Sequence, residues 1–310
     1  MKTKLAVLSG GNSFERKISL QSAKEVLKYI NKDVYDVKEI TVPNDKSISW
    51  INDLIDFTPD VVLNLLHGGE GENGSVSGLL NCLNIPTVGN CVLSGAICMN
   101  KSICKSVLKE NGVPVCEDVF IKKTNDIVDF EEKIKELSFP VIVKPNNGGG
   151  SIGIYICNDI SETKEAIKNI ISEYDDDVII EKYISGKEVT CVVVQKQNSL
   201  EVLPVLDVST NSKFYDYNAK YVDKSSKLKF STLPEFMQDM IKDIAKKVFD
   251  IFECKGICCV DLIVSDEQVY FIEVNTIPGF TAQSTVTRTL NELGIGIGDF
   301  IDGLIKNEIG

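Results

Sequence analysis

The chain has 310 residues, which exceeds the size at which one hydrophobic core normally stops growing, so we expect two or three packed domains. Hydrophobic residues make up 43% and charged residues 25%, as in an ordinary globular protein. The formal net charge of −12 argues against nucleic-acid and membrane partners, because proteins that bind those polyanions use Lys and Arg to neutralise phosphate groups.

Neither the start of the chain nor its cysteines indicates a secreted protein or a zinc framework. The apolar run after Lys4 stops at Gly10, which is too short for a signal peptide and predicts a buried strand. No stretch approaches the roughly 20 apolar residues of a membrane span. The 10 cysteines are scattered without a CxxC pair and the chain has 1 His, so we expect reduced thiols in the core of a cytoplasmic protein.

The first 95 residues alternate strand and helix patterns. Buried strands are predicted over residues 5–8 and 61–66, and helices over residues 19–30 and 76–83. This alternation predicts an α/β domain with a parallel sheet and helices on its faces.

The rest of the chain is predicted to be mixed α+β. One helix is expected over residues 95–111, ended by Gly112 and Pro114. The further expected helices are 161–174, 234–252 and one at the C-terminus, and the expected strands are 119–121, 141–144, 178–183, 189–195 and 202–206. Residues 258–264 and 269–274 predict a hairpin near the end of the chain.

A glycine-rich loop follows the predicted strand that ends at Lys144. Residues 148–153 contain four glycines, which let backbone N–H groups approach an anion without interference from Cβ atoms. The loop is therefore a candidate to close over phosphates. A flexible hairpin turn with no ligand is the alternative.

Two acids and an amide in the C-terminal hairpin form a candidate metal site. Glu273 and Asn275 share one strand face, and Asp261 lies on the preceding strand. An odd-length turn such as residues 266–268 would place Asp261 beside Glu273, whereas a two-residue turn would not. Their oxygens suit Mg²⁺. Solvated acids on an exposed hairpin are the alternative, but apolar neighbours on both strands favour a buried pair, in which unpaired acids would be costly.

Several single residues are weaker candidates. Glu181 and Glu188 bracket a strand end that could line a nucleotide pocket or a plain sheet edge. Lys101, taken alone, is expected to be a solvated charge. His67 begins a glycine-rich loop after a buried strand, where open α/β sheets bind ligands. Residues 214–221 carry four aromatics in a polar region, which is typical of a lid over a site.

These motifs resemble those of the D-alanine–D-alanine ligase family of ATP-grasp enzymes. They occur in the same order as in that family, and the resemblance covers nearly the whole chain. The motifs are Gly10-Gly11 with Glu15, Arg16 and Ser19, His67-Gly68, Gly74, Lys101, Lys144-Pro145, Glu181 with Glu188, FYDYNAKY at 214–221, Asp261, and EVNTIPG at 273–279. The resemblance implies three domains: an N-terminal α/β substrate domain (1–95), a central ATP-grasp domain (96–185), and a C-terminal ATP-grasp and metal-binding domain (186–310), the last two clasping ATP. It also implies a homodimer.

The resemblance also implies roles by position. The ATP-binding residues would be Lys101, Lys144, Glu181, Tyr183, Glu188 and Lys220. Asp261, Glu273 and Asn275 would hold two Mg²⁺ ions, with Mn²⁺ as an alternative. The catalytic group would be Glu15, Ser151, Tyr221 and Cys259, with Tyr221 closing the lid against Glu15. The amino-acid substrates would contact His67, Gly279, Ser284 and Thr285.

The reaction implied is the joining of two D-alanines through an acylphosphate, for peptidoglycan synthesis. Three positions depart from the family pattern. Cys259 stands where an arginine is usual, Gly150 replaces a serine, and Thr285 replaces a leucine. The alternatives are therefore a divergent ligase for another amino acid, hydroxy acid or amine, or a nucleotide-binding paralogue with little turnover.

Overall fold

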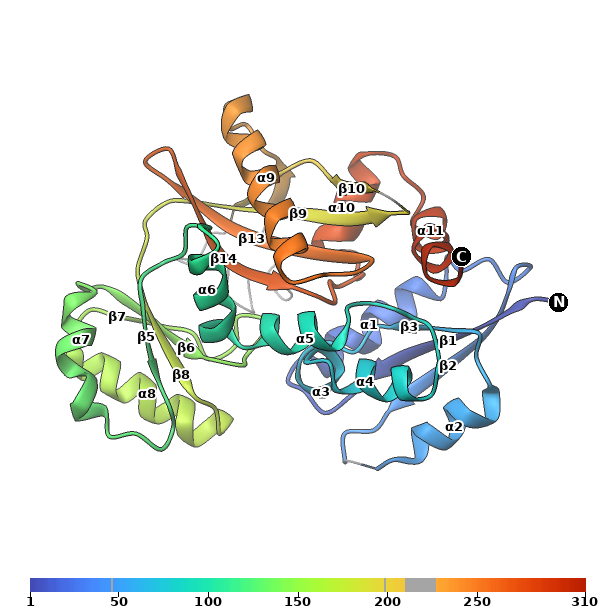
Figure 1. The fold of residues 1–310 in the computed structure, drawn as a ribbon, viewed down its shortest axis with the longest axis horizontal. Coiled ribbons are helices and arrows are strands. Elements are labelled where there is room, and N and C mark those ends of the chain that lie inside the picture. Colours follow the sequence, from blue (N-terminus) through green and yellow to red (C-terminus); the bar gives the residue numbers. More distant parts are fainter. Residues whose placement is uncertain (46, 198, 210–226) are drawn as a thin grey trace.

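The computed structural model describes residues 1–45, 47–197, 199–209 and 227–310. Three β-sheets organise this part of the chain (Figure 1). The expected lid at 214–221, and with it Lys220 and Tyr221, lies outside the described residues. No helix within these ranges combines the length and apolar character needed to cross a membrane.

The first sheet is parallel, as the alternation of strands and helices predicted. Its strand order is β2 (Tyr35–Val42), β1 (Thr3–Gly10), β3 (Val61–Asn64) and β4 (Thr87–Val88). Helix α1 (Arg16–Val26) packs on one face, while α2 (Ser49–Phe57) and α4 (Ser75–Cys82) pack on the other. The central strands are buried on both faces, which explains their unbroken apolar sequence.

The second sheet is antiparallel, with strand order β5 (Asp118–Ile121), β8 (Val178–Lys182), β6 (Val141–Pro145) and β7 (Tyr155–Cys157). Helices α7 (Glu131–Glu136) and α8 (Ile160–Tyr174), with the short 3₁₀ helix η1 (Ile127–Phe130), cover one face in a shared apolar core. The opposite face carries polar side chains and belongs to the site described below.

The third sheet is built around two long central strands, β9 (Lys187–Lys196) and β13 (Ile257–Ser265). The outer strands are β10 (Ser199–Val202), β11 (Leu206–Ser209), β12 (Lys227–Phe230) and β14 (Gln268–Asn275). One face packs on α9 (Glu235–Ile251), α5 (Val92–Met99) and α6 (Lys101–Glu110). The domain boundary expected after residue 95 falls inside α5.

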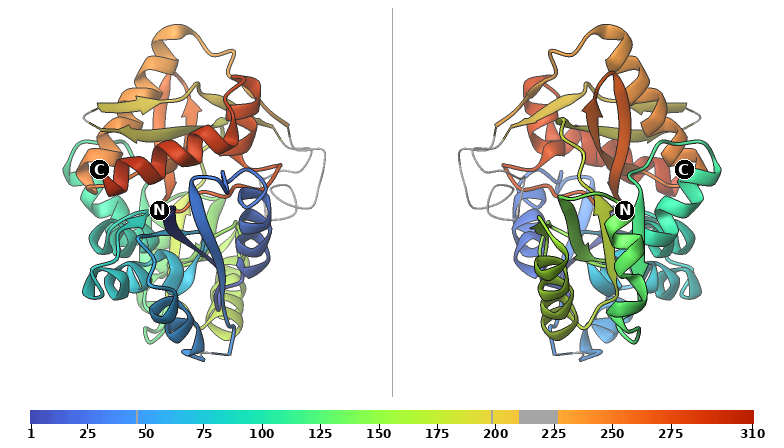
Figure 2. Two further views of the ribbon diagram at one scale, coloured as in Figure 1. Left: turned by 90° about the vertical axis from the view of Figure 1, so that its right-hand side faces the viewer. Right: turned by 90° about the vertical axis from the view of Figure 1, so that its left-hand side faces the viewer.

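The last two helices return to the first sheet. Helices α10 (Thr285–Glu292) and α11 (Ile297–Ile309) share a core with β1, β3 and α1. Figure 2 shows α11 lying between the N-terminal strands and the strands of the third sheet.

Three details of the expected secondary structure are wrong. The single helix predicted over residues 95–111 is two helices, because Asn100 has an extended backbone between them and its side chain caps α6 by accepting a hydrogen bond from Ile103 N. The strand predicted over residues 202–206 is split between β10 and β11 around Pro204, which has no N–H for a ladder. The C-terminal helix is also two helices, separated by a turn that includes Gly294 at φ 68.

Candidate active site

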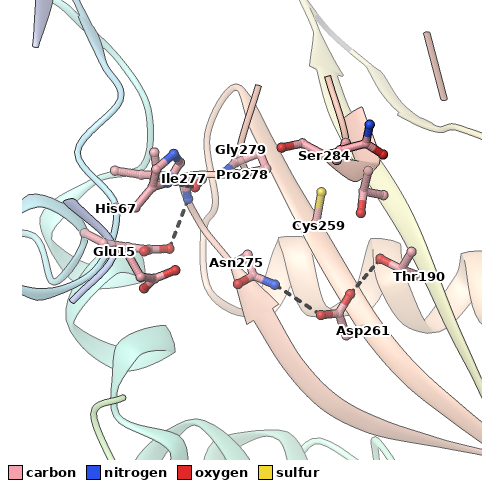
Figure 3. Close-up of a pocket in the computed structure, with 13 residues that line it drawn as sticks. Glu15, His67, Thr190, Cys259, Asp261, Asn275, Ile277, Pro278, Gly279 and Ser284 are labelled. Atoms are coloured by element: carbon pink, nitrogen blue, oxygen red, sulfur yellow. Dashed lines mark hydrogen bonds between the residues drawn. The ribbon is translucent and has the colours of Figure 1, made fainter. Parts of the chain in front are cut away.

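Two cavities meet at the carboxylate of Asp261, and between them they are lined by every described residue proposed above for the site except Lys101. The first cavity, of about 70 Å³, lies between loops of the first sheet and the ends of β13 and β14 (Figure 3). Its predicted lining residues are Glu15, His67, Cys259, Asp261, Asn275, Gly279, Ser284 and Thr285. The second cavity, of about 240 Å³, lies between the second and third sheets, and its predicted lining residues are Lys144, Ser151, Glu181, Tyr183, Glu188, Asp261 and Glu273.

Strand pairing brings the candidate metal ligands together, although not by the expected turn. The turn between β13 and β14 has two residues, Asp266 and Glu267, both with positive φ. A β-bulge immediately after Asp261 then shifts the register by one residue, so Asp261 pairs directly with Glu273. The expectation of an odd-length turn is therefore wrong, and the bulge produces the side-by-side placement instead.

Hydrogen bonds orient Asp261 in this pair of candidate ligands. The Thr190 hydroxyl donates a hydrogen bond of 2.6 Å to Oδ1 of Asp261, and Asn275 Nδ2 donates one of 3.3 Å to Oδ2 (Figure 3). Together the three candidate ligands offer two carboxylates and one amide oxygen, which fits Mg²⁺ completed by phosphate and water oxygens. Among the described residues, no three His, Cys, Asp or Glu side chains form a metal cage of their own.

The second cavity has a buried ion cluster at its wall. Oε1 of Glu181 lies 2.9 Å from Nζ of Lys144 and 2.8 Å from Nζ of Lys105 on α6. Burial acts to raise the pKa of Glu181, but the two ammonium charges outweigh it and hold that pKa at about 2. Glu181 is therefore ionised at neutral pH. No sequence pattern indicated a role for Lys105, because a lysine on an amphipathic helix is normally exposed.

The glycine-rich loop is joined to the start of α6. The backbone N–H of Lys101 donates to Asn146 O at 3.0 Å, and Ser102 N donates to Oδ1 of Asn146 at 2.9 Å. Nζ of Lys101 donates to the carbonyl of Gly148, and burial lowers its pKa. Lys101 is thus a partly buried group held against the loop, unlike the solvated charge that it would be in isolation.

Two glycines bring the loop backbone close to the Glu15 carboxylate. A Cβ atom on Gly149 would overlap Oε2 of Glu15, and one on Gly150 would lie 3.0 Å from Oε1. Gly150 also has φ +59, which disfavours a side chain. The departure from serine at position 150 therefore accompanies a close approach of the loop backbone to the Glu15 carboxylate.

His67 is held by both ring nitrogens. Nδ1 lies 2.8 Å from the carbonyl of Ile277, so it carries the proton and donates. Nε2 lies 3.2 Å from the Ser22 hydroxyl, which itself accepts from Phe280 N, so the ring accepts there. Burial lowers the pKa of His67, in keeping with a neutral ring. His67 therefore fixes the chain at 277–280 beside the first cavity.

Glu72, which was not among the predicted site residues, lines the first cavity and accepts four hydrogen bonds. Its Oε1 accepts from Thr276 N, Thr276 Oγ1 and Ile277 N at 3.0, 3.1 and 3.1 Å, and its Oε2 accepts from Gly68 N at 3.0 Å. One side chain of the first sheet's loops thus holds the segment that follows Asn275. Its place in a run of glycines and acids offered no sequence signal for this role.

Ser284 ends the wall of the first cavity at the start of α10. Its Oγ accepts from Thr281 N at 3.0 Å and lies 2.9 Å from Thr281 Oγ1. A Cβ atom on Gly279 would come within 2.7 Å of the same Oγ, so a larger residue there would displace the Ser284 hydroxyl. Thr285 follows as the first residue of α10, and Cys259 lines the cavity from β13 with 5% of its surface exposed (Figure 3).

Comparison with known proteins finds related sequences and a similar fold along the whole chain. A family model described as D-ala D-ala ligase C-terminus matches residues 107–306. D-alanine–D-alanine ligase B from Clostridium perfringens is 36% identical over 310 residues, covering 99% of this chain and 98% of the relative. The D-alanine–D-alanine ligase from Clostridium beijerinckii is 37% identical, with the same coverage.

Solved structures agree. The D-alanine–D-alanine ligase from Bacillus anthracis complexed with ATP has a TM-score of 0.85 at 29% identity, covering 99% of this chain and 97% of that one. The VanG D-Ala:D-Ser ligase from Enterococcus faecalis has a TM-score of 0.84 at 29% identity, covering 99% of this chain and 100% of that one. The chain therefore belongs to the D-alanine–D-alanine ligase family and has its ATP-grasp fold.

Proposed function

We propose that the protein is an ATP-dependent, ADP-forming ligase that joins two D-alanines through an acylphosphate, for peptidoglycan synthesis. The observation that carries this proposal is the shared wall at Asp261. A cavity with the buried Lys144 and the ionised Glu181 lies on one side, and a smaller cavity with Glu15 and Ser284 lies on the other. Relatives named as D-alanine–D-alanine ligases support the choice of substrate.

The larger cavity would take ATP. Its apolar lining, which includes Ile142 and Leu262, suits the flat face of a nucleobase, and Glu181 and Glu188, which also line it, would accept hydrogen bonds from base and ribose donors. Lys101 and Lys144 would contact phosphates. Asp261, Glu273 and Asn275 would hold Mg²⁺, which neutralises phosphate charge when bound.

The smaller cavity would hold the amino acids. Glu15 would bind the ammonium group of the first D-alanine, and Ser284 the carboxylate of the second. The carboxylate of the first D-alanine attacks the γ-phosphate to give an acylphosphate and ADP. The amine of the second attacks the acyl carbon and releases phosphate. His67 and Glu72 serve both steps by fixing the segment after Asn275, which orients the reacting groups.

A second candidate function is ligation of a different acceptor. Cys259 occupies the wall of the smaller cavity, and the described residues that line that cavity include no Lys or Arg. Its polar lining, with Gln283 and Thr285, could suit an acceptor other than D-alanine. One structural relative is a D-Ala:D-Ser ligase, so the acceptor varies among proteins of this fold.

Phosphate release by purified protein with ATP and Mg²⁺ tests both candidates. D-alanine should stimulate release and give a dipeptide detected by mass. Release with another amino acid or amine, and not with D-alanine, would favour the second candidate. ATP turnover that no acid or amine stimulates would contradict the assignment as a ligase. Location in the cytoplasm and the homodimer stay predictions.

A further inference from the structure

Lys105 is a buried cation that the proposed reaction does not use. Its side chain is 2% exposed, and it is among the largest fully buried side chains of the described residues. Its Nζ lies 2.8 Å from Oε1 of Glu181 and 3.8 Å from Oδ1 of Asp118. Lys144 and Glu181 line the nucleotide cavity, whereas Lys105 is not among the described residues that line it.

The geometry gives one carboxylate oxygen two ammonium partners. Lys144 approaches Oε1 of Glu181 at 2.9 Å from the cavity side, and Lys105 approaches the same atom from α6. Asp118 and Glu181 are register partners on β5 and β8, so their side chains share the sheet face that Lys105 covers. The charges of the two acids in this cluster are therefore balanced only when both lysines are present.

Nucleotide binding would disturb this balance. Of the two lysines, Lys144 lines the cavity, and in the proposed function it contacts phosphate. If Lys144 turned away from a Glu181 that had no other partner, a buried carboxylate would be left uncompensated, which is strongly unfavourable. Lys105 removes that obstacle because it stays in place on α6.

We propose that Lys105 is a positioning residue for nucleotide binding, the permanent counter-ion of Glu181 that allows Lys144 to move from Glu181 to the phosphates of the nucleotide. The proposal rests on the proposed nucleotide site. Without Lys105, the ion pair with Lys144 would be the one that Glu181 retains among the described residues, and phosphate would have to compete for Lys144.

The test is nucleotide affinity in Lys105→Met, measured by calorimetry with ADP and Mg²⁺, together with steady-state kinetics. We expect the Kd for ADP and the KM for ATP to rise about tenfold or more, while the KM for D-alanine changes by less than about twofold. Lys105→Arg keeps the charge and should stay within about threefold of wild type. Lys109→Met is the matched control, since Lys109 is exposed on the same helix.

A double variant separates the proposed role of Lys105 in nucleotide binding from its role in balancing the charge of Asp118. Lys105→Met with Asp118→Asn removes the buried cation together with its partly exposed partner acid, so the net charge of the cluster is unchanged and the protein should fold with a melting temperature close to that of wild type. Weak ADP binding in this double variant supports the proposal. Wild-type ADP affinity in either the single or the double variant overturns it.

The same experiment distinguishes this inference from the proposed function. ADP binding needs no turnover, so a wild-type protein that binds ADP but joins no amino acids would contradict the ligase while leaving the role of Lys105 testable. A wild-type protein that does not bind ADP would contradict both.

Discussion

Glu72→Gln should damage amino-acid handling and spare ATP binding. Glu72 accepts four hydrogen bonds, three from Thr276 and Ile277 and one from Gly68. A hydrogen bond to a charged group is worth about 1.5–3 kcal/mol, against about 1 kcal/mol for a neutral pair. Glutamine keeps one acceptor oxygen but turns an NH₂ group toward the N–H of Gly68. We therefore expect a loss of about 3 kcal/mol in the ordering of the segment after Asn275.

A loss of that size corresponds to about a 100-fold fall in kcat/KM for D-alanine, because about 1.4 kcal/mol is a factor of ten. Glu72 lines the smaller cavity and is not among the described residues of the nucleotide cavity, so the KM for ATP should change by less than about twofold. Coupled phosphate-release kinetics with each substrate varied measures both values. Glu70→Gln is the control, because Glu70 is exposed on the same short helix, α3 (Gly69–Glu72). If kcat/KM for D-alanine stayed within about threefold of wild type, the bonds of Glu72 would not set the geometry of the site.

Three further predictions concern the loop, the metal pair and the ion cluster. Glu273→Gln removes a charged ligand beside Asp261 and should abolish turnover with Mg²⁺; wild-type phosphate release would sink the assignment as a metal ligand. Gly150→Ser introduces a side chain at φ +59, with its Cβ 3.0 Å from Glu15, and should cost about 1–2 kcal/mol and raise the KM for D-alanine; an unchanged KM in the same assay would show that the loop relaxes freely. The pKa of Glu181, about 2, lies below its ordinary 4.5, so its ionised form stabilises the fold above about pH 4.5 and this contribution is lost as the pH falls from 4.5 to 2. Thermal unfolding should therefore show wild type losing stability in that window more steeply than Glu181→Gln, and parallel curves would contradict the cluster.

The sequence predicted the parts of the fold whose pattern is local and strong. The buried strands around residues 5–8 and 61–66 were evident because both faces are apolar. Strand β2 and helix α2 were missed, since polar residues interrupt β2 and α2 buries only Trp50 and Leu54. The break at Asn100 depends on a cap within an otherwise helical pattern, which hydrophobic spacing does not register.

The site residues that belong to a recognisable motif could be predicted from the sequence. Those that gain their role from tertiary packing could not. Strand periodicity placed Glu273 and Asn275 on one face, and an assumed odd-length turn placed Asp261 beside Glu273, but the bulge that aligns the two acids leaves no mark in the sequence. Lys105 and Thr190 gain their importance from residues far along the chain, Glu181 and Asp261, which come beside them only when the sheets assemble. Contacts of this kind need the tertiary structure.

The return of α10 and α11 to the first sheet has a consequence for how the chain acquires its structure. The face of the sheet that carries Leu5 and Val7 shares its core with Leu290 and Ile301. During synthesis those strands emerge from the ribosome early, and the helices that complete their cover emerge near the end. An apolar face is therefore left open for most of translation, which invites aggregation or chaperone binding at that stage. A fragment that lacks α10 and α11 would keep that liability permanently, however intact its remaining sheets.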